Sequence, residues 1–345
     1  MPAPRGWQMS NELRPPIILF GNTRSGTTIV QKVVSTHPDV VGWYEPNELW
    51  VYADPGRIHD EFDENDATLQ VKQYIRERFL KYQRRNENRR IIEKTPKNIL
   101  RIPYVRAVLP EATFLFIVRN PFSFISSVEY KYQRTVTKRG IIRRLKHTPV
   151  SQLHYWMRLF FVQKFTKYIL RKKYLKIWGP RYRGIQDDLK RHDLLTVMAR
   201  QWSVCSKKAE KDMLQFGNKQ ILRLKYEDFV NDPIPELIRI CAHCGLDMSS
   251  YMVEAAKKIV KSDRNAKWKR FDLLDLARVL PEIRGEMQRH GYEIPAELMP
   301  YIEKASPDDE VGRFDQLDPS RSTLAPLAME NESSQVGYDR PTSRI

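Results

Sequence analysis

Four short apolar runs, each followed by a turn and then by a helical pattern, constrain the fold of this chain more than any other feature. The runs lie at residues 17–20, 91–93, 114–118 and 221–224. Runs of this length between turn residues are typical of buried strands. Because repeated strand, crossover helix and strand units give parallel pairing, the pattern predicts an α/β fold with a parallel sheet and helices on both faces.

The size of the chain is compatible with this fold. Its 345 residues, 41% of them hydrophobic, are enough for one large α/β domain or two ordinary ones. We expect a single domain over residues 17–305. Residues 1–16 are polar and rich in proline and are expected to form a loose arm, whereas the polar tail at 306–345 is expected to be disordered.

The composition argues against several classes of protein. No run of about 18 apolar residues occurs, so no transmembrane helix is expected. Residues 1–14 lack the apolar segment of a signal peptide. Three cysteines are too few for a disulfide-stapled fold and fit a reducing compartment. We therefore expect a cytoplasmic protein that attaches at most peripherally to a membrane.

The net charge of +17 comes almost entirely from one segment. Residues 131–186 contain sixteen Lys and Arg and no Asp or Glu, whereas the rest of the chain carries 43 basic and 42 acidic residues. Residues 151–178 of this segment are rich in aromatics and show a helical pattern. This basic helical insert is expected to be an acceptor lid or a membrane-facing segment. Its charge predicts a surface for anions, either an acidic membrane or a polyanionic glycan, with nucleic acid less favoured.

The first apolar run ends in a turn of the kind that binds phosphate. Gly21 and Gly26 frame the pattern G-x-x-x-x-G, and a helical pattern starts at Thr27. In that context the backbone N–H groups of residues 25–28 converge on an anion at the helix N-terminus. A Walker loop carries lysine where this chain has Thr27, and the cation lies instead at Arg24. The pattern indicates an anion site, although a tight turn without a ligand stays open on this pattern alone.

This loop also resembles a motif of a known enzyme family. The segment Thr23-Arg24-Ser25-Gly26-Thr27-Thr28 is similar to the 5′-phosphosulfate loop of the sulfotransferases that use 3′-phosphoadenosine 5′-phosphosulfate (PAPS), many of which carry lysine at the position of Arg24. Arg119 at the end of a strand and Ser127 eight residues later resemble the motif that binds the 3′-phosphate in this family. The resemblance extends from about Ile17 to about Tyr292 and is weak between 131 and 180.

The resemblance implies a set of residues that bind the PAPS donor. Lys267 and Trp268 lie in a stretch similar to the late basic loop that closes over the nucleotide, while Tyr226-Glu227-Asp228 is similar to a segment with a structural role. Trp202 is expected in the core rather than on the adenine. The donor residues so implied are Asn22, Thr23, Arg24, Ser25, Gly26, Thr27, Thr28, Arg119, Ser127, Lys267 and Trp268.

The acceptor side of the site is implied by two further segments. Glu45, followed by Pro46, matches the position of the catalytic base in glycan-modifying sulfotransferases; an ordinary exposed carboxylate is the alternative, and Glu48 is a nearby rival. Glu93-Lys94-Thr95-Pro96 resembles a segment of the same enzymes, which implies that Lys94 assists catalysis. The acceptor so implied is a hydroxyl of a carbohydrate or glycolipid.

No metal-binding pattern is present, and no metal is expected. The seven histidines are scattered, and Cys241 and Cys244 lie in an apolar helical pattern that is more typical of packing.

Two other functions stay open. One is a P-loop kinase that uses ATP and Mg²⁺, which the threonine at position 27 disfavours. The other is a non-enzymatic domain that binds anionic membranes or nucleic acid through the basic insert. That second function leaves Arg119 and Ser127 without a role.

Overall fold

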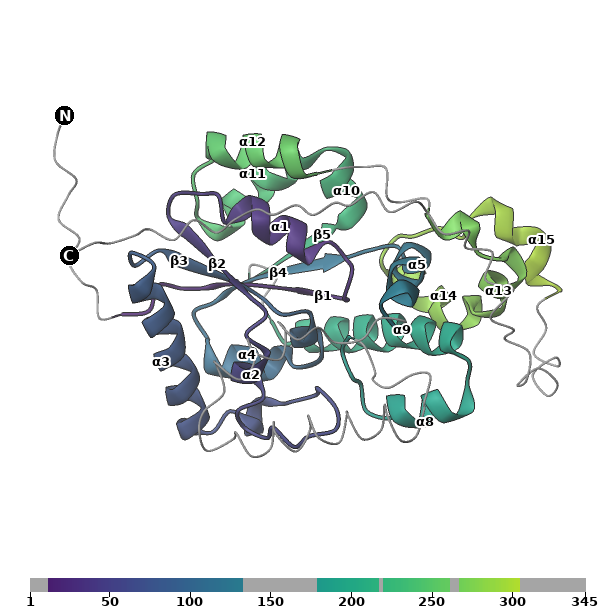
Figure 1. Cartoon of the computed structure of the whole chain (residues 1–345), viewed down its shortest axis with the longest axis horizontal. Coiled ribbons are helices and arrows are strands. Elements are labelled where there is room, and N and C mark those ends of the chain that lie inside the picture. The colour runs from purple at the N-terminus through teal and green to yellow at the C-terminus, as the bar shows by residue number, and fades with distance from the viewer. Residues whose placement is uncertain (1–11, 133–178, 217–219, 261–266, 305–345) are drawn as a thin grey trace, which may run out of the picture. The chain divides into compact units, whose positions relative to one another are not determined.

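The computed structural model describes residues 12–132, 179–216, 220–260 and 267–304. Its centre is a five-stranded parallel sheet in the order β2-β3-β1-β4-β5 (Figure 1). The strands are β1 (Ile17–Gly21), β2 (Val40–Tyr44), β3 (Arg90–Lys94), β4 (Thr113–Val118) and β5 (Ile221–Lys225). The predicted parallel α/β sheet is therefore confirmed.

Helices cover both faces of the sheet (Figure 1). One face carries α1 (Thr27–Val34), α10 (Tyr226–Asn231), α11 (Pro233–Cys244) and α12 (Ser250–Ile259). The other carries α2 (Asn47–Trp50), α3 (Leu69–Arg85), α4 (Ile102–Val108) and α9 (Leu194–Met213). The remaining α-helices are α5 (Pro121–Tyr132), α8 (Ile185–Arg191), α13 (Leu273–Arg278), α14 (Leu280–Arg289) and α15 (Met299–Ile302). Four 3₁₀ helices complete the described elements: η1 (Glu64–Asp66), η2 (Pro96–Leu100), η4 (Lys267–Arg270) and η5 (Ala296–Leu298).

The side chains of the central strands alternate between two hydrophobic cores. In β1, Ile17 and Leu19 join the core under α1 and α11, whereas Ile18 and Phe20 join the core on the α9 side. Successive strand residues point to opposite faces, so a strand covered on both faces is apolar along its whole length. This explains why the central strands are recognisable in the sequence as continuous apolar runs.

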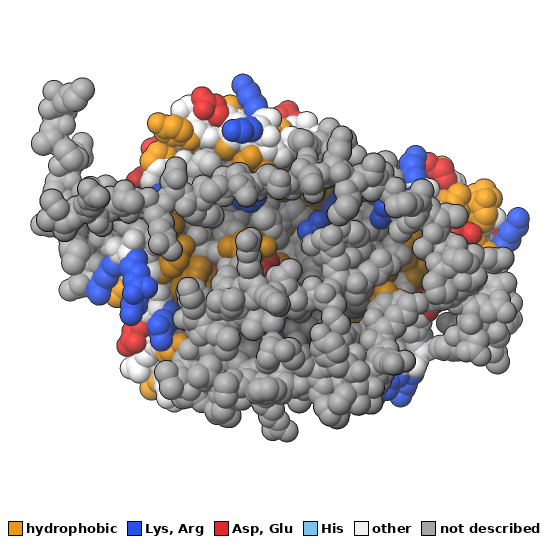
Figure 2. Space-filling model, viewed as in Figure 1, with side chains coloured by type: hydrophobic (Ala, Val, Ile, Leu, Met, Phe, Trp, Pro, Cys, Tyr) orange, Lys and Arg blue, Asp and Glu red, His pale blue; other side chains and the backbone are white. Residues whose placement is uncertain are grey.

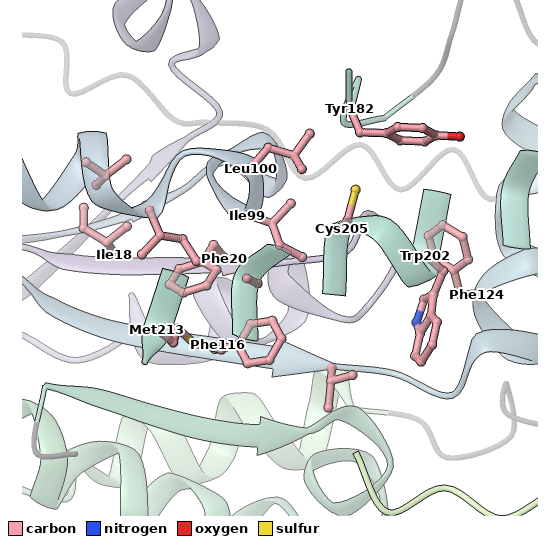
Figure 3. Packing of buried hydrophobic residues seen from close by; sticks show 14 of the residues in the cluster. Ile18, Phe20, Ile99, Leu100, Phe116, Phe124, Tyr182, Trp202, Cys205 and Met213 are labelled. Atoms are coloured by element: carbon pink, nitrogen blue, oxygen red, sulfur yellow. The ribbon is translucent and has the colours of Figure 1, made fainter. Parts of the chain in front are cut away.

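Aromatic rings fill the core on the α9 side. Figure 3 shows Phe20 beside Phe116 of β4 and, from α9, the side chains of Trp202 and Cys205. The rings of Phe20 and Phe116 stack with centroids 5.5 Å apart. Trp202 is completely buried, which confirms its expected place in the core. Cys241 and Cys244 are buried in the other core, as their helical pattern indicated.

Strand β2 was missing from the sequence prediction. It pairs only with β3, at the edge of the sheet, and most of its residues are partly exposed. Its sequence is Val40-Val41-Gly42-Trp43-Tyr44, in which β-branched and aromatic residues do favour a strand, so the prediction overlooked this signal. Its presence matters because β2 leads directly to Glu45.

The expectations for the basic insert, the tail and the N-terminal arm concern residues that lie largely outside the described ranges, at 133–178, from 305 onward and at 1–11. The end of that arm is attached: the backbone N–H of Arg14 donates to Gln83 of α3 at 2.9 Å. The domain boundaries stay predictions. Of the helices in the described ranges, none is long and apolar enough to cross a membrane.

Basic residues are exposed at the surface near α3. Figure 2 shows Lys and Arg side chains gathered near α3 on the face that is drawn. Helix α3 ends with Arg84 and Arg85, which complement the negative end of the helix dipole.

Candidate active site

The candidate site residues lie at one edge of the sheet. Because all five strands are parallel, their carboxyl ends meet at the same edge, where ligands bind in open α/β sheets. The β1–α1 loop (residues 22–26) follows β1, Glu45 follows β2, Lys94 ends β3 and Arg119 follows β4. The topology thus brings together segments that are up to about a hundred residues apart.

The β1–α1 loop is a tight turn with two residues in the left-handed region. Arg24 has φ +66° and Gly26 has φ +89°. A Cβ atom on Gly26 would lie 2.2 Å from Cδ2 of Tyr226, at the start of α10. Only glycine therefore fits this position, both for its backbone angle and for its contact with the tyrosine ring.

Hydrogen bonds from Asn22 fix the β1–α1 loop to α9. Nδ2 of Asn22 donates to Oγ of Ser206 at 2.8 Å and to the carbonyl oxygen of Trp202 at 3.3 Å. The N–H of Ser25 donates to the carbonyl oxygen of Asn22 at 3.1 Å and closes the turn. The amide nitrogen of Asn22 and the N–H of Ser25 thus hold the loop itself, whereas the first N–H groups of α1, at Thr27 and Thr28, have no intrahelical acceptor.

Two buried hydroxyl groups in this loop can donate hydrogen bonds to an anionic ligand. Oγ of Ser25, Oγ1 of Thr23 and Oδ1 of Asn22 are buried and have no hydrogen-bond partner among the described residues. A buried hydroxyl without a partner costs about 1–3 kcal/mol. Phosphate or sulfate oxygens would accept hydrogen bonds from the two hydroxyl groups, so the chemistry of the loop matches the donor implied by the sequence.

Arg119 lies between the β1–α1 loop and α10. Its Nη1 donates to the carbonyl oxygen of Arg24 at 2.9 Å, and its guanidinium lies 4.3 Å from the centre of the Tyr226 ring. The carbonyl oxygen of Arg119 accepts from Nε1 of Trp202 at 3.0 Å. The backbone and side chain of Arg119 are thus both fixed. The ring of Tyr226, in the segment for which the sequence predicted a structural role, packs against both Gly26 and the guanidinium of Arg119.

Ser127 is joined directly to the β1–α1 loop. Nε of Arg24 donates to Oγ of Ser127 at 2.8 Å, and Ser127 lies on α5, the helix that follows Arg119. Asn120 caps this helix, because its Oδ1 accepts from the N–H of Phe122 at 3.0 Å. The cap and the first-turn Pro121 agree with the sequence prediction for the start of α5. Arg24, Arg119 and Ser127 therefore form one cluster.

Glu45 and Lys94 form an ion pair at the ends of β2 and β3. Nζ of Lys94 lies 2.6 Å from Oε1 of Glu45 and 4.0 Å from the centre of the Tyr44 ring. The Lys94 side chain is 1% exposed and that of Glu45 is 26% exposed. Burial lowers the pKa of Lys94, and the carboxylate of Glu45 opposes this shift. The charge of Arg24 also acts on Lys94, so the pair lies near the β1–α1 loop.

Glu93, next to Lys94, is a buried carboxyl group that the sequence did not single out. It accepts from Nε1 of Trp50 at 3.2 Å, from Nδ2 of Asn98 at 3.1 Å and from the hydroxyl of Thr95. Burial raises its pKa to about 7, against the effect of the hydrogen bonds from Thr95 and Trp50. The hydrogen bonds of Glu93 connect the segment after β3 to α2. Glu48, the alternative candidate for the catalytic base, lies on α2 and is largely buried.

The late basic loop packs on α5. Trp268 in η4 is 9% exposed, and its ring centre lies 5.7 Å from that of Phe122. Nη2 of Arg270 donates to the carbonyl oxygen of Ser126 at 3.2 Å. Lys267 begins η4. Arg270, which the sequence did not single out among the site residues, therefore brings a further cation next to Ser127.

The described residues contain no group of three or more His, Cys, Asp or Glu side chains that could hold a metal ion.

Solved structures share this fold. The sulfotransferase domain from the curacin biosynthetic pathway matches with a TM-score of 0.50 and 14% identity, over 82% of this chain and 100% of that one. The sulfotransferase domain from the Synechococcus PCC 7002 olefin synthase matches with a TM-score of 0.51 and 15% identity, over 84% and 100%. At these identities the likeness concerns the fold alone.

The sequence itself has relatives. The nodulation protein NoeE of Sinorhizobium fredii is 25% identical over 139 residues, which cover 35% of this chain and 33% of that protein. The sequence model of the sulfotransferase family matches residues 15–177 and 172–250, which include the β1–α1 loop, Glu45, Lys94, Arg119 and Ser127. This match covers more than half of the chain, which therefore belongs to the sulfotransferase family.

Proposed function

We propose that this protein transfers the sulfuryl group of PAPS to a hydroxyl group of a carbohydrate or glycolipid. The observation that carries the proposal is the hydrogen bond between Arg24 and Ser127, because it joins two separate groups of anion-binding residues at one sheet edge. A nucleotide with phosphate on both its 3′ and 5′ positions needs two such groups side by side. The ion pair of Glu45 and Lys94 supplies the third part of the site.

The donor is held by residues from β1, β4 and α5. Arg24, Ser25, Thr27 and Thr28 bind the 5′-phosphosulfate, with Thr23 lining the loop and Gly26 allowing close approach of the backbone. Arg119 and Ser127 bind the 3′-phosphate, since guanidinium groups form strong hydrogen bonds with phosphate. Asn22 supports the loop through α9, and the η4 segment with Lys267 and Trp268 covers the nucleotide.

The transfer is an in-line displacement at sulfur. The acceptor oxygen forms a bond to sulfur while the bond between sulfur and the phosphate oxygen breaks, which leaves 3′,5′-adenosine bisphosphate. Glu45 takes the proton of the acceptor hydroxyl as general base. Lys94 orients Glu45 and places a positive charge near the leaving phosphate.

The proposal of a carbohydrate or glycolipid acceptor is supported by the segments around Glu45 and Lys94. Glu45 followed by Pro46, and Glu93-Lys94-Thr95-Pro96, resemble segments of glycan-modifying sulfotransferases. The charged insert at 131–186 supports an anionic partner, either the glycan itself or an acidic membrane surface that presents a glycolipid.

Transfer from radiolabelled PAPS tests the proposal. Purified protein is incubated with labelled PAPS and a panel of neutral and acidic glycans, glycolipids and simple phenols, and the products are identified by mass spectrometry. We expect label in a glycan or glycolipid, unchanged by EDTA and absent in Arg119→Ala. Label only in phenols overturns the acceptor class. Phosphate transfer from ATP that EDTA abolishes, without sulfuryl transfer, overturns the reaction.

A further inference from the structure

The peptide unit that joins Arg119 to Asn120 is held on both sides. Its carbonyl oxygen accepts from Nε1 of Trp202 on α9 at 3.0 Å. Its N–H group donates to Oε1 of Glu227 on α10 at 3.1 Å. The residues on either side of this peptide unit both serve the proposed 3′-phosphate site, because Arg119 carries the guanidinium and Asn120 caps α5, the helix of Ser127. A rotation of this one peptide would therefore displace both phosphate-binding groups.

Glu227 also accepts a hydrogen bond from a residue far along the chain. The hydroxyl of Tyr292 donates to Oε2 of Glu227 at 2.8 Å, while Oε1 faces the N–H of Asn120. Each carboxylate oxygen thus has its own donor, so the carboxylate cannot turn without the loss of a bond. Burial raises the pKa of Tyr292, and the negative charge of Glu227 raises it further. The phenol therefore keeps its proton and remains a donor.

The end of α14 fixes the position of Tyr292. The N–H of Tyr292 donates to the carbonyl oxygen of Met287 at 2.8 Å, and the N–H of Gly291 donates to that of Gln288 at 3.0 Å. Together with φ +66° at Gly291, these bonds form a Schellman motif. Met287 is completely buried in the core on the α9 side, and α14 packs against α9. The phenol is therefore carried by a helix end that is anchored in the core.

The same helix end also contacts the other partner of the peptide. The ring of His290 meets that of Trp202 edge to face, with centroids 6.0 Å apart and planes at 76°. Nζ of Lys225, the last residue of β5, donates to the carbonyl oxygen of Gly291 at 3.2 Å. Consecutive residues at the end of α14 thus contact Trp202, β5 and Glu227. The end of α14 supports both hydrogen bonds that hold the Arg119–Asn120 peptide.

The charge of Glu227 does not by itself favour phosphate binding. Its carboxylate acts electrostatically on Arg119, and a negative charge near the guanidinium repels an incoming phosphate. Any benefit of Glu227 to the proposed donor site therefore comes from its geometry.

We propose that Tyr292 and Glu227 are positioning residues for recognition of the 3′-phosphate of the donor. They hold the Arg119–Asn120 peptide so that the guanidinium of Arg119 and the hydroxyl of Ser127 face the same phosphate. This inference rests on the proposed function, and it adds to that function a support from the end of α14. Hydrogen bonds between guanidinium and phosphate depend strongly on orientation. Preference for a 3′-phosphorylated nucleotide should therefore depend on Tyr292, whereas binding of the rest of the nucleotide should not.

Titration of Tyr292→Phe with two nucleotides tests this role. Calorimetry gives the Kd of 3′,5′-adenosine bisphosphate and that of 5′-AMP, which lacks the 3′-phosphate. We expect the preference for the bisphosphate to fall roughly three- to ten-fold in Tyr292→Phe, with 5′-AMP binding unchanged. A residue that only stabilised the fold would affect both nucleotides equally or neither. An unchanged preference in this variant overturns the inference.

Two substitutions of Glu227 separate its position from its charge. Glutamine and leucine both remove the charge, but only glutamine can accept from the N–H of Asn120 and bond to the hydroxyl of Tyr292. We expect Glu227→Gln to prefer the bisphosphate at least as strongly as the wild type, and Glu227→Leu to lose roughly ten-fold or more of this preference. Equal preferences in the two variants would show that only the charge matters and would overturn the inference.

Tyr182→Phe is the matched control. It also removes a hydrogen bond from a buried phenol to a carboxylate, that of Asp188 on α8, and it should leave the preference unchanged. A wild type that does not prefer the bisphosphate contradicts the proposed donor site itself. A wild-type preference that Tyr292→Phe retains in full contradicts only the positioning role, so the two failures are distinguishable.

Discussion

The ammonium group of Lys94 lies 2.6 Å from the carboxylate of Glu45, although the two residues are 49 positions apart in the sequence. Parallel pairing of β2 with β3 creates this contact, because Tyr44 and Lys94 are partners in the register. The N–H of Glu45 also donates to the carbonyl oxygen of Lys94 at 3.0 Å, and Glu45 adopts φ +46°. The backbone thus fixes the carboxylate beside a buried ammonium group.

Replacement of Glu45 by glutamine should remove the proposed catalytic base and leave the proposed donor site intact. We expect kcat to fall roughly 10²–10⁴-fold, while the affinity for 3′,5′-adenosine bisphosphate stays within a few-fold. Steady-state kinetics and calorimetry measure the two quantities. Glu48→Gln is the control, since Glu48 lies on α2 and is largely buried. Loss of activity in that variant, with Glu45→Gln still active, would move the base to Glu48.

Arg24 and Ser127 should be coupled in nucleotide binding, because Nε of Arg24 bonds to Oγ of Ser127. We expect Arg24→Lys and Ser127→Ala each to weaken binding of the bisphosphate, and the double variant to lose less than the sum of the two losses. The coupling free energy should be about 0.5–3 kcal/mol. A double-mutant cycle by calorimetry measures it. Strict additivity would show that the two residues act independently.

Alanine at Gly26 should destabilise the protein and abolish nucleotide binding. The added Cβ meets the Tyr226 ring at 2.2 Å, and φ +89° is unfavourable for any L-residue with a side chain. We expect the free energy of unfolding to fall by about 2–5 kcal/mol. Gly285→Ala in α14 is the matched control, because open space surrounds that position, and it should gain about 0.5–1 kcal/mol. Urea denaturation compares the two variants, and equal effects would contradict the packing described for the β1–α1 loop.

Glu93 should contribute stability to the folded protein that falls as the pH rises from about 4.5 to about 7. Glu93 has its pKa raised from 4.5 to about 7 by burial, so the folded state binds more protons than the unfolded state in this window. This contribution to stability is complete below the lower value and lost as the pH passes the upper one. Asp60, whose pKa is lowered, acts only in more acidic solution.

Glu93→Gln isolates this effect, since the amide keeps the shape of the side chain and does not titrate. Urea denaturation across the pH range should give a smaller slope for this variant than for the wild type. The same slope in both proteins would show that folding does not raise the pKa of Glu93.

The sequence predicted four of the five strands, including the edge strand β5. Strands β1 and β4 are buried on both faces, so their apolar residues, such as Ile18, Leu115 and Ile117, form uninterrupted runs. The edge strand β2 was not predicted, and neither was the pairing that places Glu45 beside Lys94.

The proposed donor-binding residues lie in local motifs, whereas the residues that hold them in place depend on tertiary contacts. The glycine loop, Arg119 and Ser127 are recognisable from short segments with fixed spacing. By contrast, Asp60 meets Arg181 across 121 positions, and Arg270 reaches the carbonyl oxygen of Ser126 across 144. No local pattern encodes such pairs. The sequence around Asp60 gives no indication that this residue is buried.

Calorimetric titration with 3′,5′-adenosine bisphosphate and 5′-AMP tests most directly whether the sheet edge is a site for a doubly phosphorylated nucleotide. We predict that the wild type binds the bisphosphate at least about 100-fold more tightly than 5′-AMP, and that Arg119→Ala loses most of this difference. Equal binding of the two nucleotides, or binding of neither by the folded protein, would contradict the proposed donor site and with it the proposed reaction.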